Sequence, residues 1–366
     1  MIRGVLQRIL PGSFAQRTSR IDTDRRRQTQ IQPTDINLPP ALNNQLALRN
    51  DQLVGERFRV RQLIGQGGMG AVFSATDTTT GKDAVLKLAL NGWDNFIDSE
   101  ASVLTALAGD QQPHIVGFLG QGTIRTAKGD ARYLALEYVG KETLHDTLSR
   151  GRLSLPWAME IASQICFGLA KAAEKGVYHR DIKPANIMLR DDDGKAVLID
   201  FGLARTEGAI GTLPYMSPQQ QLGENIDPRD DIYSLGITLF EMLTSASPFR
   251  NKYNVEALLR EKLDNPLPPI PYVTPSAQRL INSMTAPTRE QRPQSYDEII
   301  RAIAEIKSEI QALQNCLADL NQEVAQAVNP FDSAELIPTD LNSKGLTLPV
   351  EFAPTIQQAL PPTLVI

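Results

Sequence analysis

Cysteine and histidine are scarce in this sequence, and long apolar runs are missing from it. Only two cysteines, Cys166 and Cys316, occur in 366 residues. This argues against a disulfide framework and for a reducing compartment, so we expect a cytoplasmic protein. Two cysteines and three histidines without ligand-like spacing also argue against a structural zinc site. No segment approaches the roughly 18 apolar residues that a membrane-spanning helix needs.

The net charge hides an uneven distribution. The chain carries a formal charge of −5, from 37 Lys and Arg against 42 Asp and Glu. Its basic start holds seven of those arginines and only Asp22 and Asp24 within residues 1–30, so the remainder is clearly acidic. This distribution leaves no broad basic surface, and we expect no nucleic-acid partner. A hydrophobic content of 42% is typical of a globular protein with a sizeable core.

Residues 1–53 differ in composition from the remainder of the chain. They are rich in Arg, Gln, Asn, Thr and Pro without a sustained strand pattern, so we predict a mostly disordered basic segment. Residues 1–10 are an exception, because their apolar residues fall on one helical face before Pro11 and Gly12. A short basic amphipathic helix predicts weak contact with an anionic membrane surface. Docking on the protein's own body and fraying are the alternatives, since ten residues form only a marginal helix.

The central part of the chain changes from strand patterns to helical patterns. Residues 58–139 read as short apolar strands separated by turns, with one helical stretch at 95–108. From Thr143 onward helical patterns dominate, and the clearest covers residues 154–175, with Ser154 as a predicted N-cap. The sequence therefore predicts an α+β protein with a small β-rich lobe, a larger helical lobe and a ligand site between them.

A glycine-rich segment follows the first predicted strand of the β-rich lobe. It runs from Gly65 to Val72 as Gly-Gln-Gly-Gly-Met-Gly-Ala-Val. Glycines allow backbone amides to approach phosphate oxygens closely, although a simple hairpin fits the segment equally well. Lys87 then lies alone within the apolar strand 84–88. A buried charge needs a partner, and Glu100 on the following helix is the candidate; the alternative is an edge lysine that points to solvent.

A more specific segment is Tyr-His-Arg-Asp-Ile-Lys-Pro-Ala-Asn at residues 178–186. It combines an acid, two bases and a carboxamide in one turn-prone loop. Two predicted strands, 187–190 and 195–199, come next and are joined by an Asp-Asp-Asp-Gly turn. The hairpin returns Asp200 to the same end as Asn186, which places a carboxylate and an amide oxygen where they suit a hard cation.

Together these segments resemble the eukaryotic-type protein kinase family, and they are most similar to its bacterial Ser/Thr kinases. The resemblance covers residues 58–306 and implies a bilobal protein kinase-like fold. It implies that ATP and Mg²⁺ are used to phosphorylate Ser or Thr hydroxyls of protein substrates. The residues that would bind ATP are Ile64, Gly65, Gln66, Gly67, Gly68, Met69, Gly70, Val72, Lys87, Glu137 and Val139, with Glu100 positioning Lys87.

The resemblance also assigns roles in phosphoryl transfer. Asp181 would accept the proton of the substrate hydroxyl, and Lys183 would neutralise charge on the γ-phosphoryl group. Asn186 and Asp200 would hold magnesium. Thr212, within the segment 211–218 that resembles a substrate-binding segment, would hydrogen-bond Asp181 and Lys183. This segment, together with Lys183, indicates Ser/Thr rather than tyrosine specificity.

Further positions follow from the same resemblance. Leu104, His179 and Phe201 would form an internal hydrophobic stack, and Asp231 would anchor the catalytic loop, residues 179–186. Gln219 replaces an acidic residue that in the family pairs with the arginine matching Arg292, so we expect a buried ion pair to become a neutral-to-charged hydrogen bond. The spacing from Lys87 to Glu100 is also short for the family, and we expect the helix that carries Glu100 to lose its first turn.

The activation segment, residues 202–217, is short for the family, so ordering it costs less conformational entropy. In many relatives a phosphorylated residue there pairs with the arginine that matches Arg180. Thr206 is the candidate phosphosite, and Glu207 supplies a permanent negative charge nearby. We expect activity that is largely independent of phosphorylation of this segment; an autophosphorylation switch at Thr206 is the alternative.

Two other functions share parts of this pattern. A pseudokinase would bind ATP or a partner without phosphoryl transfer, but such proteins usually lack one of three groups that are all present here, Lys87, Asp181 and Asp200. A small-molecule phosphotransferase of similar architecture typically lacks the Lys183 position and the segment 211–218. Both fit the sequence less well than a protein kinase.

A regular apolar pattern runs through residues 297–328. Its members recur at alternating spacings of four and three, and they are Ile299, Ile303, Ile306, Ile310, Leu313, Leu317, Leu320 and Val324. This heptad seam predicts an extended helix in a coiled coil, and hence a homodimer through residues 299–327. The alternative is that the seam packs back on the helical lobe. Residues 329–366 contain six prolines and no clear period, and we predict a disordered tail.

Overall fold

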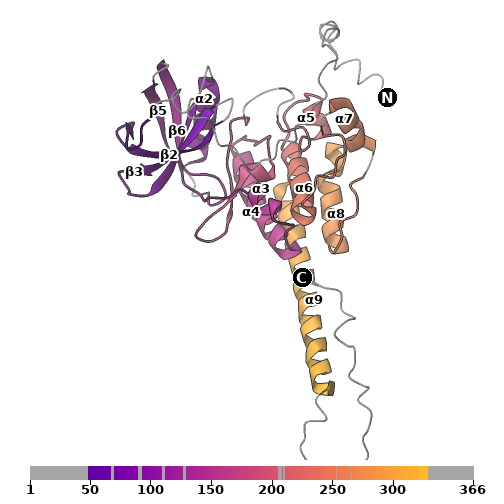
Figure 1. The fold of residues 1–366 in the computed structure, drawn as a ribbon. Coiled ribbons are helices and arrows are strands. Elements are labelled where there is room, and N and C mark those ends of the chain that lie inside the picture. The colour runs from indigo at the N-terminus through magenta and orange to yellow at the C-terminus, as the bar shows by residue number, and fades with distance from the viewer. Residues whose placement is uncertain are drawn as a thin grey trace, which may run out of the picture.

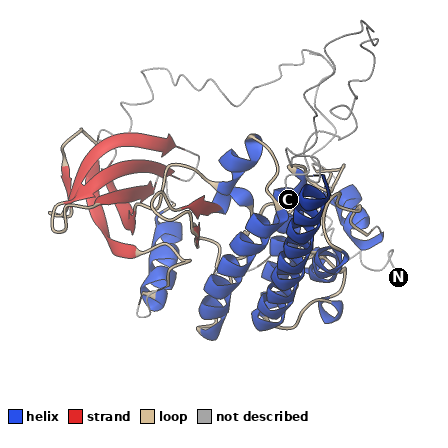
Figure 2. Cartoon of the chain, turned by 90° about the horizontal axis from the view of Figure 1, so that it is seen from below, coloured by secondary structure: helices blue, strands red, loops and turns tan. Residues whose placement is uncertain are grey.

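The computed structural model describes residues 48–66, 70–89, 93–108, 112–126, 129–204, 208, 211–252, 254–264 and 266–328. They form a sheet-rich N-terminal lobe and a helical C-terminal lobe, from which one long helix projects (Figure 1 and Figure 2). The predicted α+β architecture with two unlike lobes is confirmed. The predictions made for residues 1–47 and 329–366, including the amphipathic start, lie outside the described residues.

The N-terminal lobe combines an antiparallel sheet with the helix α2. The strands lie in the order β1-β2-β3-β4-β6-β5. Along β3, buried and half-buried residues alternate, as expected of a strand with one face on a core. The helix α2 packs against β4, β5 and β6. The bounds are β1 Leu53–Val54, β2 Phe58–Gln66, β3 Gly70–Asp77, β4 Asp83–Ala89, α2 Asp94–Leu107, β5 Phe118–Thr126 and β6 Gly129–Glu137.

The folded lobe begins earlier than the sequence indicated. Leu53 belongs to β1 and pairs with Arg59, and the N–H of Asp51 donates to Val60 O at 2.8 Å. The prediction of disorder up to residue 53 is therefore wrong for residues 48–53. A two-residue strand has no periodicity to recognise, and only its pairing with β2 orders it.

The C-terminal lobe is built around α6, which is buried around most of its circumference. The helix α4 packs against α6, α9 and β8. A hairpin of β7 and β8 follows the catalytic loop, as predicted, with Gly194 in its turn at φ +71°. The bounds are α3 Leu144–Ser149, α4 Leu155–Glu174, β7 Ile187–Leu189, β8 Ala196–Leu198, α5 Pro218–Gln221, α6 Pro228–Thr244, α7 Val255–Asp264, α8 Pro275–Met284 and α9 Tyr296–Val328.

The helix α4 matches the predicted span of residues 154–175. Ser154 is its extended N-cap residue, although its side chain makes no capping hydrogen bond, and Gly176 follows the helix at φ +68°. Four of its large side chains are almost fully buried, and each such burial contributes about 1.5–3 kcal/mol. These residues are Met159, Ile161, Ile165 and Leu169.

The helix α9 extends over the whole predicted heptad pattern but divides it into two parts. Ile299, Ile303, Ile306 and Ile310 are at most 6% exposed and belong to the core of the helical lobe, where α9 packs on α4 and α8. The second half projects from the body, and its Leu313, Leu317, Leu320 and Val324 are 42–59% exposed (Figure 1). The prediction that the first half forms an intermolecular seam is therefore wrong.

Within the described residues, none of the helices combines the length and apolarity that crossing a bilayer requires.

Candidate active site

Lys87 extends from β4 and its ammonium bridges two carboxylates from different elements. Nζ lies 2.7 Å from Glu100 Oε2 and 2.9 Å from Asp200 Oδ1. Glu100 is buried on α2, whereas Asp200 follows β8 in the helical lobe. The short spacing between Lys87 and Glu100 does not prevent the pair, because α2 begins at Asp94 and Glu100 lies on its second turn. One cation thus links the two lobes.

The three charges control each other's ionisation. Burial alone would lower the pKa of Lys87, but the carboxylates of Glu100 and Asp200 outweigh it and raise this pKa. Burial raises the pKa of Glu100, against the opposing influence of Lys87. Burial alone would raise the pKa of Asp200, yet the ammonium of Lys87 holds this pKa below its usual value. Lys87 therefore stays cationic and Asp200 stays anionic at neutral pH.

Asp181, in the catalytic loop, is held by donors from both sides. Its Oδ1 accepts hydrogen bonds from Thr212 N at 2.9 Å and Thr212 Oγ1 at 2.7 Å. Its Oδ2 accepts from Lys183 Nζ at 2.6 Å and Asn186 Nδ2 at 3.0 Å. Lys183 Nζ also donates to Thr212 Oγ1 at 2.7 Å, so the threonine hydroxyl accepts from the lysine while it donates to the aspartate.

The backbone is strained at two positions of the site, and a buried carboxylate supports the one in the catalytic loop. Arg180 and Asp200 adopt φ +69° and +67°, values that cost non-glycine residues about 1–3 kcal/mol each. Asp231 accepts from the backbone N–H groups of His179 and Arg180 at 2.7 Å each, which matches its predicted anchoring position. Burial raises the pKa of Asp231 to about 6. The anchor thus offsets the strain near Arg180.

Two of the three residues of the predicted hydrophobic stack, His179 and Phe201, are in contact beneath the site. The rings of His179 and Phe201 lie with centroids 4.7 Å apart, and both residues are fully buried. Leu104 of α2 is buried in the same core cluster as Phe201. His179 also hydrogen-bonds Ile199 O through Nε2 at 2.9 Å, so it is a satisfied core histidine.

The glycine-rich segment is described only at its two ends. Gly65 and Gln66 close β2 and pair with Val72 and Ala71 of β3, while Ile64 is half exposed. A Cβ atom added at Gly70 would lie 2.3 Å from Leu88 O, so only glycine lets β3 approach β4 there. The predicted phosphate-binding residues Gly67, Gly68 and Met69 lie outside the described residues.

The segment Leu136–Val139, which resembles the hinge that pairs with adenine in protein kinases, is tied to the helical lobe by contacts that sequence reasoning missed. Arg190 donates to the two carboxylate oxygens of Glu137 at 3.0 and 3.2 Å, and Glu137 Oε1 also accepts the N–H of Gly117 at 2.9 Å. The N–H of Asp191 donates to Val139 O at 3.2 Å. No motif marks Arg190 or Asp191; the hairpin of β7 and β8 brings them to the hinge.

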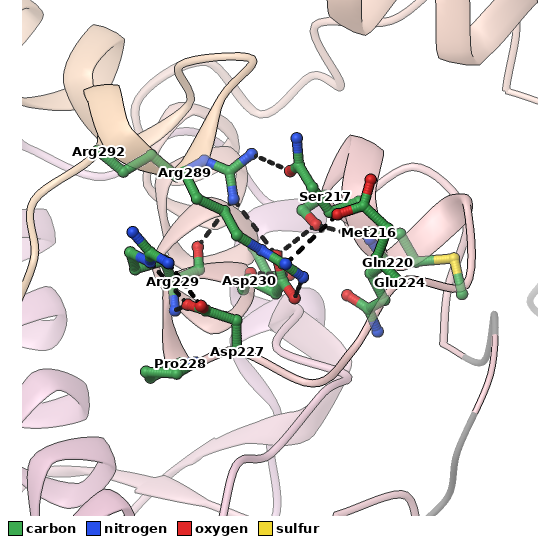
Figure 3. Close-up of polar contacts among 12 residues, drawn as sticks. Met216, Ser217, Gln220, Glu224, Asp227, Pro228, Arg229, Asp230, Arg289 and Arg292 are labelled. Carbon is green, nitrogen blue, oxygen red and sulfur yellow. Dashed lines mark hydrogen bonds and ion pairs between the residues drawn. The ribbon is translucent and has the colours of Figure 1, made fainter. Parts of the chain in front are cut away.

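The end of the activation segment rests on a network of buried charges. Arg289 and Arg292 converge on Asp230, at 2.6 and 3.4 Å (Figure 3). Ser217 also donates to Asp230, at 2.7 Å. Gln219 Oε1 accepts from Arg292 Nη2 at 2.6 Å, which confirms the predicted replacement of an ion pair by a neutral-to-charged hydrogen bond.

The middle of the activation segment contacts the catalytic loop at Gly208. Arg180 Nη2 donates to Gly208 O at 2.8 Å. The arginine that relatives pair with a phosphate is therefore engaged with the unmodified backbone. Thr206 and Glu207 lie outside the described residues.

Comparison with known proteins agrees with this geometry. The Protein kinase domain family matches residues 58–303, more than half of the chain. The chain belongs to the protein kinase family.

Several bacterial relatives share this domain. Serine/threonine-protein kinase A of Synechocystis is 32% identical over 297 residues, which cover 72% of this chain and 56% of that protein. Serine/threonine-protein kinase PknB of Mycolicibacterium smegmatis is 30% identical over 312 residues, 79% of this chain and 49% of that protein. The probable serine/threonine-protein kinase PknB of Bifidobacterium longum is 36% identical over 217 residues, which cover 54% of this chain and 31% of that protein. The chain thus spans about half, or less, of the length of these relatives.

Proposed function

We propose that this chain is a Ser/Thr protein kinase, which transfers the γ-phosphoryl group of ATP to Ser or Thr hydroxyls of protein substrates. The observation that carries the proposal is the hydrogen-bonded set of Asp181, Lys183 and Thr212. It places a carboxylate and a cation together at the start of the substrate-binding segment. The names of the bacterial relatives agree with Ser/Thr specificity.

The chain's own groups divide the work between nucleotide and acceptor. Lys87, fixed by Glu100, binds the α- and β-phosphates of ATP. Asp181 accepts the proton of the attacking hydroxyl, and its own hydrogen bonds to Thr212 and Lys183 hold it in place for that role. Lys183 faces the charge that develops on the transferred group.

Asn186 and Asp200 are suited to hold Mg²⁺, which would neutralise charge on the phosphates. The amide nitrogen of Asn186 is already used, because Nδ2 donates to Asp181 O at 2.8 Å and to Asp181 Oδ2. Its carbonyl oxygen is the atom that suits a hard cation. The Asp200 side chain is 42% exposed and its carboxylate is anionic, so it also fits the ion.

Two variants and the wild type test the proposal. Wild-type protein, Asp181→Ala and the exposed-site control Lys171→Ala are incubated with labelled ATP, Mg²⁺ and a generic protein substrate. We expect transfer to Ser and Thr by the wild type and the control, and none by Asp181→Ala, which still binds ATP. ATP binding without transfer by the wild type would support a pseudokinase instead, and transfer only to small molecules would support the other phosphotransferase class.

Activation without phosphorylation is the second part of the proposal. The contact between Arg180 and Gly208 supports it, because the backbone of the short segment already engages this arginine. Activity after phosphatase treatment, compared between wild type and Thr206→Ala, tests it. An inactive Thr206→Ala enzyme would establish the phosphorylation switch in its place.

The distal half of α9 supports a homodimer. Four exposed apolar residues there keep heptad spacing. Of the positions that flank this seam, Gln314, Cys316 and Asn321 are uncharged and Glu323 is acidic. We propose a two-heptad coiled coil through Leu313, Leu317, Leu320 and Val324.

A cytoplasmic location and contact of residues 1–10 with a membrane surface remain proposals from the sequence.

A further inference from the structure

Lys262, on α7, is a buried lysine whose donors are all used by the segment that follows the active site. Lys262 is 2% exposed. Nζ donates to Leu213 O at 2.6 Å, to Met216 O at 2.7 Å and to Gln221 Oε1 at 3.2 Å. An ammonium has three N–H groups, so this set satisfies it completely. Among the described residues no carboxylate lies within ion-pair range of Lys262.

Lys262 holds residues 211–216, the segment whose first residues contact the catalytic base Asp181. Thr212, which bonds Asp181, directly precedes Leu213. Residues 211–216 form no helix or strand, so most of their carbonyl groups need donors from elsewhere. Lys262 supplies donors to the carbonyls of Leu213 and Met216. Ser234 Oγ of α6 supplies another donor, to Tyr215 O at 2.8 Å.

Packing around the ammonium fixes its position. The side chain lies over the Phe249 ring, with Nζ 5.5 Å from the ring centroid. Gln221, its third acceptor, is itself held because its Nε2 donates to Val255 O at 2.7 Å. The helices α5 and α7, which carry these groups, pack against each other (Figure 1). Lys262 is therefore held on one side by α5 and on the other by the aromatic ring.

A lysine is an unfavourable residue for this position if packing is its only purpose. Burying a cation without a counter-charge is costly, and burial lowers the pKa of Lys262 to about 7. A methionine would fill nearly the same volume without that penalty. The ammonium of lysine, unlike the thioether of methionine, donates to two carbonyls of one irregular segment at once.

We infer that Lys262 is a positioning residue for the protein substrate: by holding the carbonyls of Leu213 and Met216, it fixes the surface on which the acceptor peptide lies. This inference rests on the proposed kinase function. ATP is served by a separate set of groups around Lys87 on β4, which Lys262 does not contact. Loss of Lys262 should therefore weaken the enzyme for protein substrate and not for nucleotide.

Steady-state kinetics separate these effects. Wild-type enzyme, Lys262→Met, Lys262→Arg and the control Arg260→Met are assayed on a generic protein substrate, with ATP and substrate varied independently. Arg260 lies on the same helix but is exposed and pairs with Glu256. For Lys262→Met we expect the KM for protein substrate to rise roughly tenfold while the KM for ATP stays within about twofold. Lys262→Arg, which retains a donor head, should recover part of the loss, and Arg260→Met should match the wild type.

Each outcome decides the inference. Equal changes in the KM for ATP and for protein, or a protein KM that stays at the wild-type value, would overturn it. If Lys262→Met does not fold, Lys262→Gln, whose amide nitrogen is one bond closer to the backbone and carries two N–H groups instead of three, replaces it and must show a selective rise in the KM for protein substrate. A wild-type enzyme that transfers no phosphoryl group would refute the kinase proposal, whereas an active wild type with an unchanged Lys262→Met refutes only the role of Lys262.

Discussion

Gln219 and Arg292 lie 73 positions apart in the chain, and their side chains meet in a 2.6 Å hydrogen bond. Arg292 is fully buried, and burial lowers its pKa to about 10. Its second guanidinium nitrogen faces Asp230 at 3.4 Å. Gln219 also donates from Nε2 to Pro287 O at 2.8 Å. One neutral side chain thus links the end of the activation segment to the loop that carries Arg292.

Replacement of Gln219 by methionine should destabilise the protein without affecting nucleotide binding. The variant keeps the side-chain volume but leaves a buried guanidinium donor short of a partner, which costs about 1–3 kcal/mol. Urea unfolding of Gln219→Met measures the loss. The exposed neighbour Glu224→Gln, which touches Arg289 at 3.4 Å, serves as control and should change stability by less than about 0.5 kcal/mol. Equal stability of Gln219→Met and wild type would contradict the expected role.

Thr212→Val should lower kcat while the fold is kept. The hydroxyl of Thr212 bonds both Asp181 and Lys183, and valine has the same shape without that group. We expect a loss of about 10- to 100-fold in kcat, because the base and the cation lose their common partner. Thr212→Ser, which retains a hydroxyl, should stay near the wild type. Wild-type turnover by Thr212→Val would show that the hydroxyl does not position Asp181.

The buried Lys262 should make stability depend on alkaline pH. Its pKa is about 7 in the folded protein against 10.5 for an exposed lysine. Between these values the unfolded chain binds more protons, so the free energy of unfolding rises with pH, by at most about 1.4 kcal/mol per pH unit. This stability is complete above the pKa of the unfolded state, 10.5, and is lost progressively as the pH falls toward the folded pKa of about 7. The difference in unfolding free energy between wild type and Lys262→Met, measured from pH 6 to 9, should be flat at first and then change steadily in favour of the wild type. A constant difference over the whole range would contradict the lowered pKa.

The two halves of α9 should respond in opposite ways to the same substitution. Ile306→Asp places a carboxylate in the core of the helical lobe and should cost more than about 4 kcal/mol, a large part of the roughly 5–15 kcal/mol that stabilises a typical domain. Leu313→Asp alters an exposed position and should leave the thermal midpoint of the monomer unchanged while it weakens self-association. Thermal unfolding and sedimentation of both variants beside wild type measure these effects. A wild-type monomer at micromolar concentration, unchanged by Leu313→Asp, would refute the homodimer.

Much of the site could be predicted because its signals are local or depend on simple topology. The loop from His179 to Asn186 carries its acid, base and amide within eight residues. The turn at Gly194 predicts a hairpin, and a hairpin must return Asp200 to the level of Asn186. Lys87 needed a counter-charge because its strand is apolar, and Glu100 on the next helix supplies it.

Other features depend on contacts between distant parts of the chain. Arg190 reaches Glu137, and Lys262 reaches Leu213, across 53 and 49 positions, and no spacing rule connects either pair. The strand β1 forms only because β2 accepts it. None of these contacts leaves a periodic pattern in the sequence, so local reasoning does not find them.

The helix α9 separates the two kinds of information most clearly. The amino-acid pattern alone predicts a helix with an apolar stripe over residues 297–328, because spacings of four and three place the apolar residues on one face of an α-helix; the observed helix is Tyr296–Val328. The pattern does not tell what covers the stripe; that depends on the packing of the folded chain. Ile310 still lies against the helical lobe, whereas Leu313, one turn later, has passed its edge. The stripe is uniform along the helix, but the surface that buries it ends where α4 and α8 end, and that limit is a property of packing between elements rather than of the helix itself.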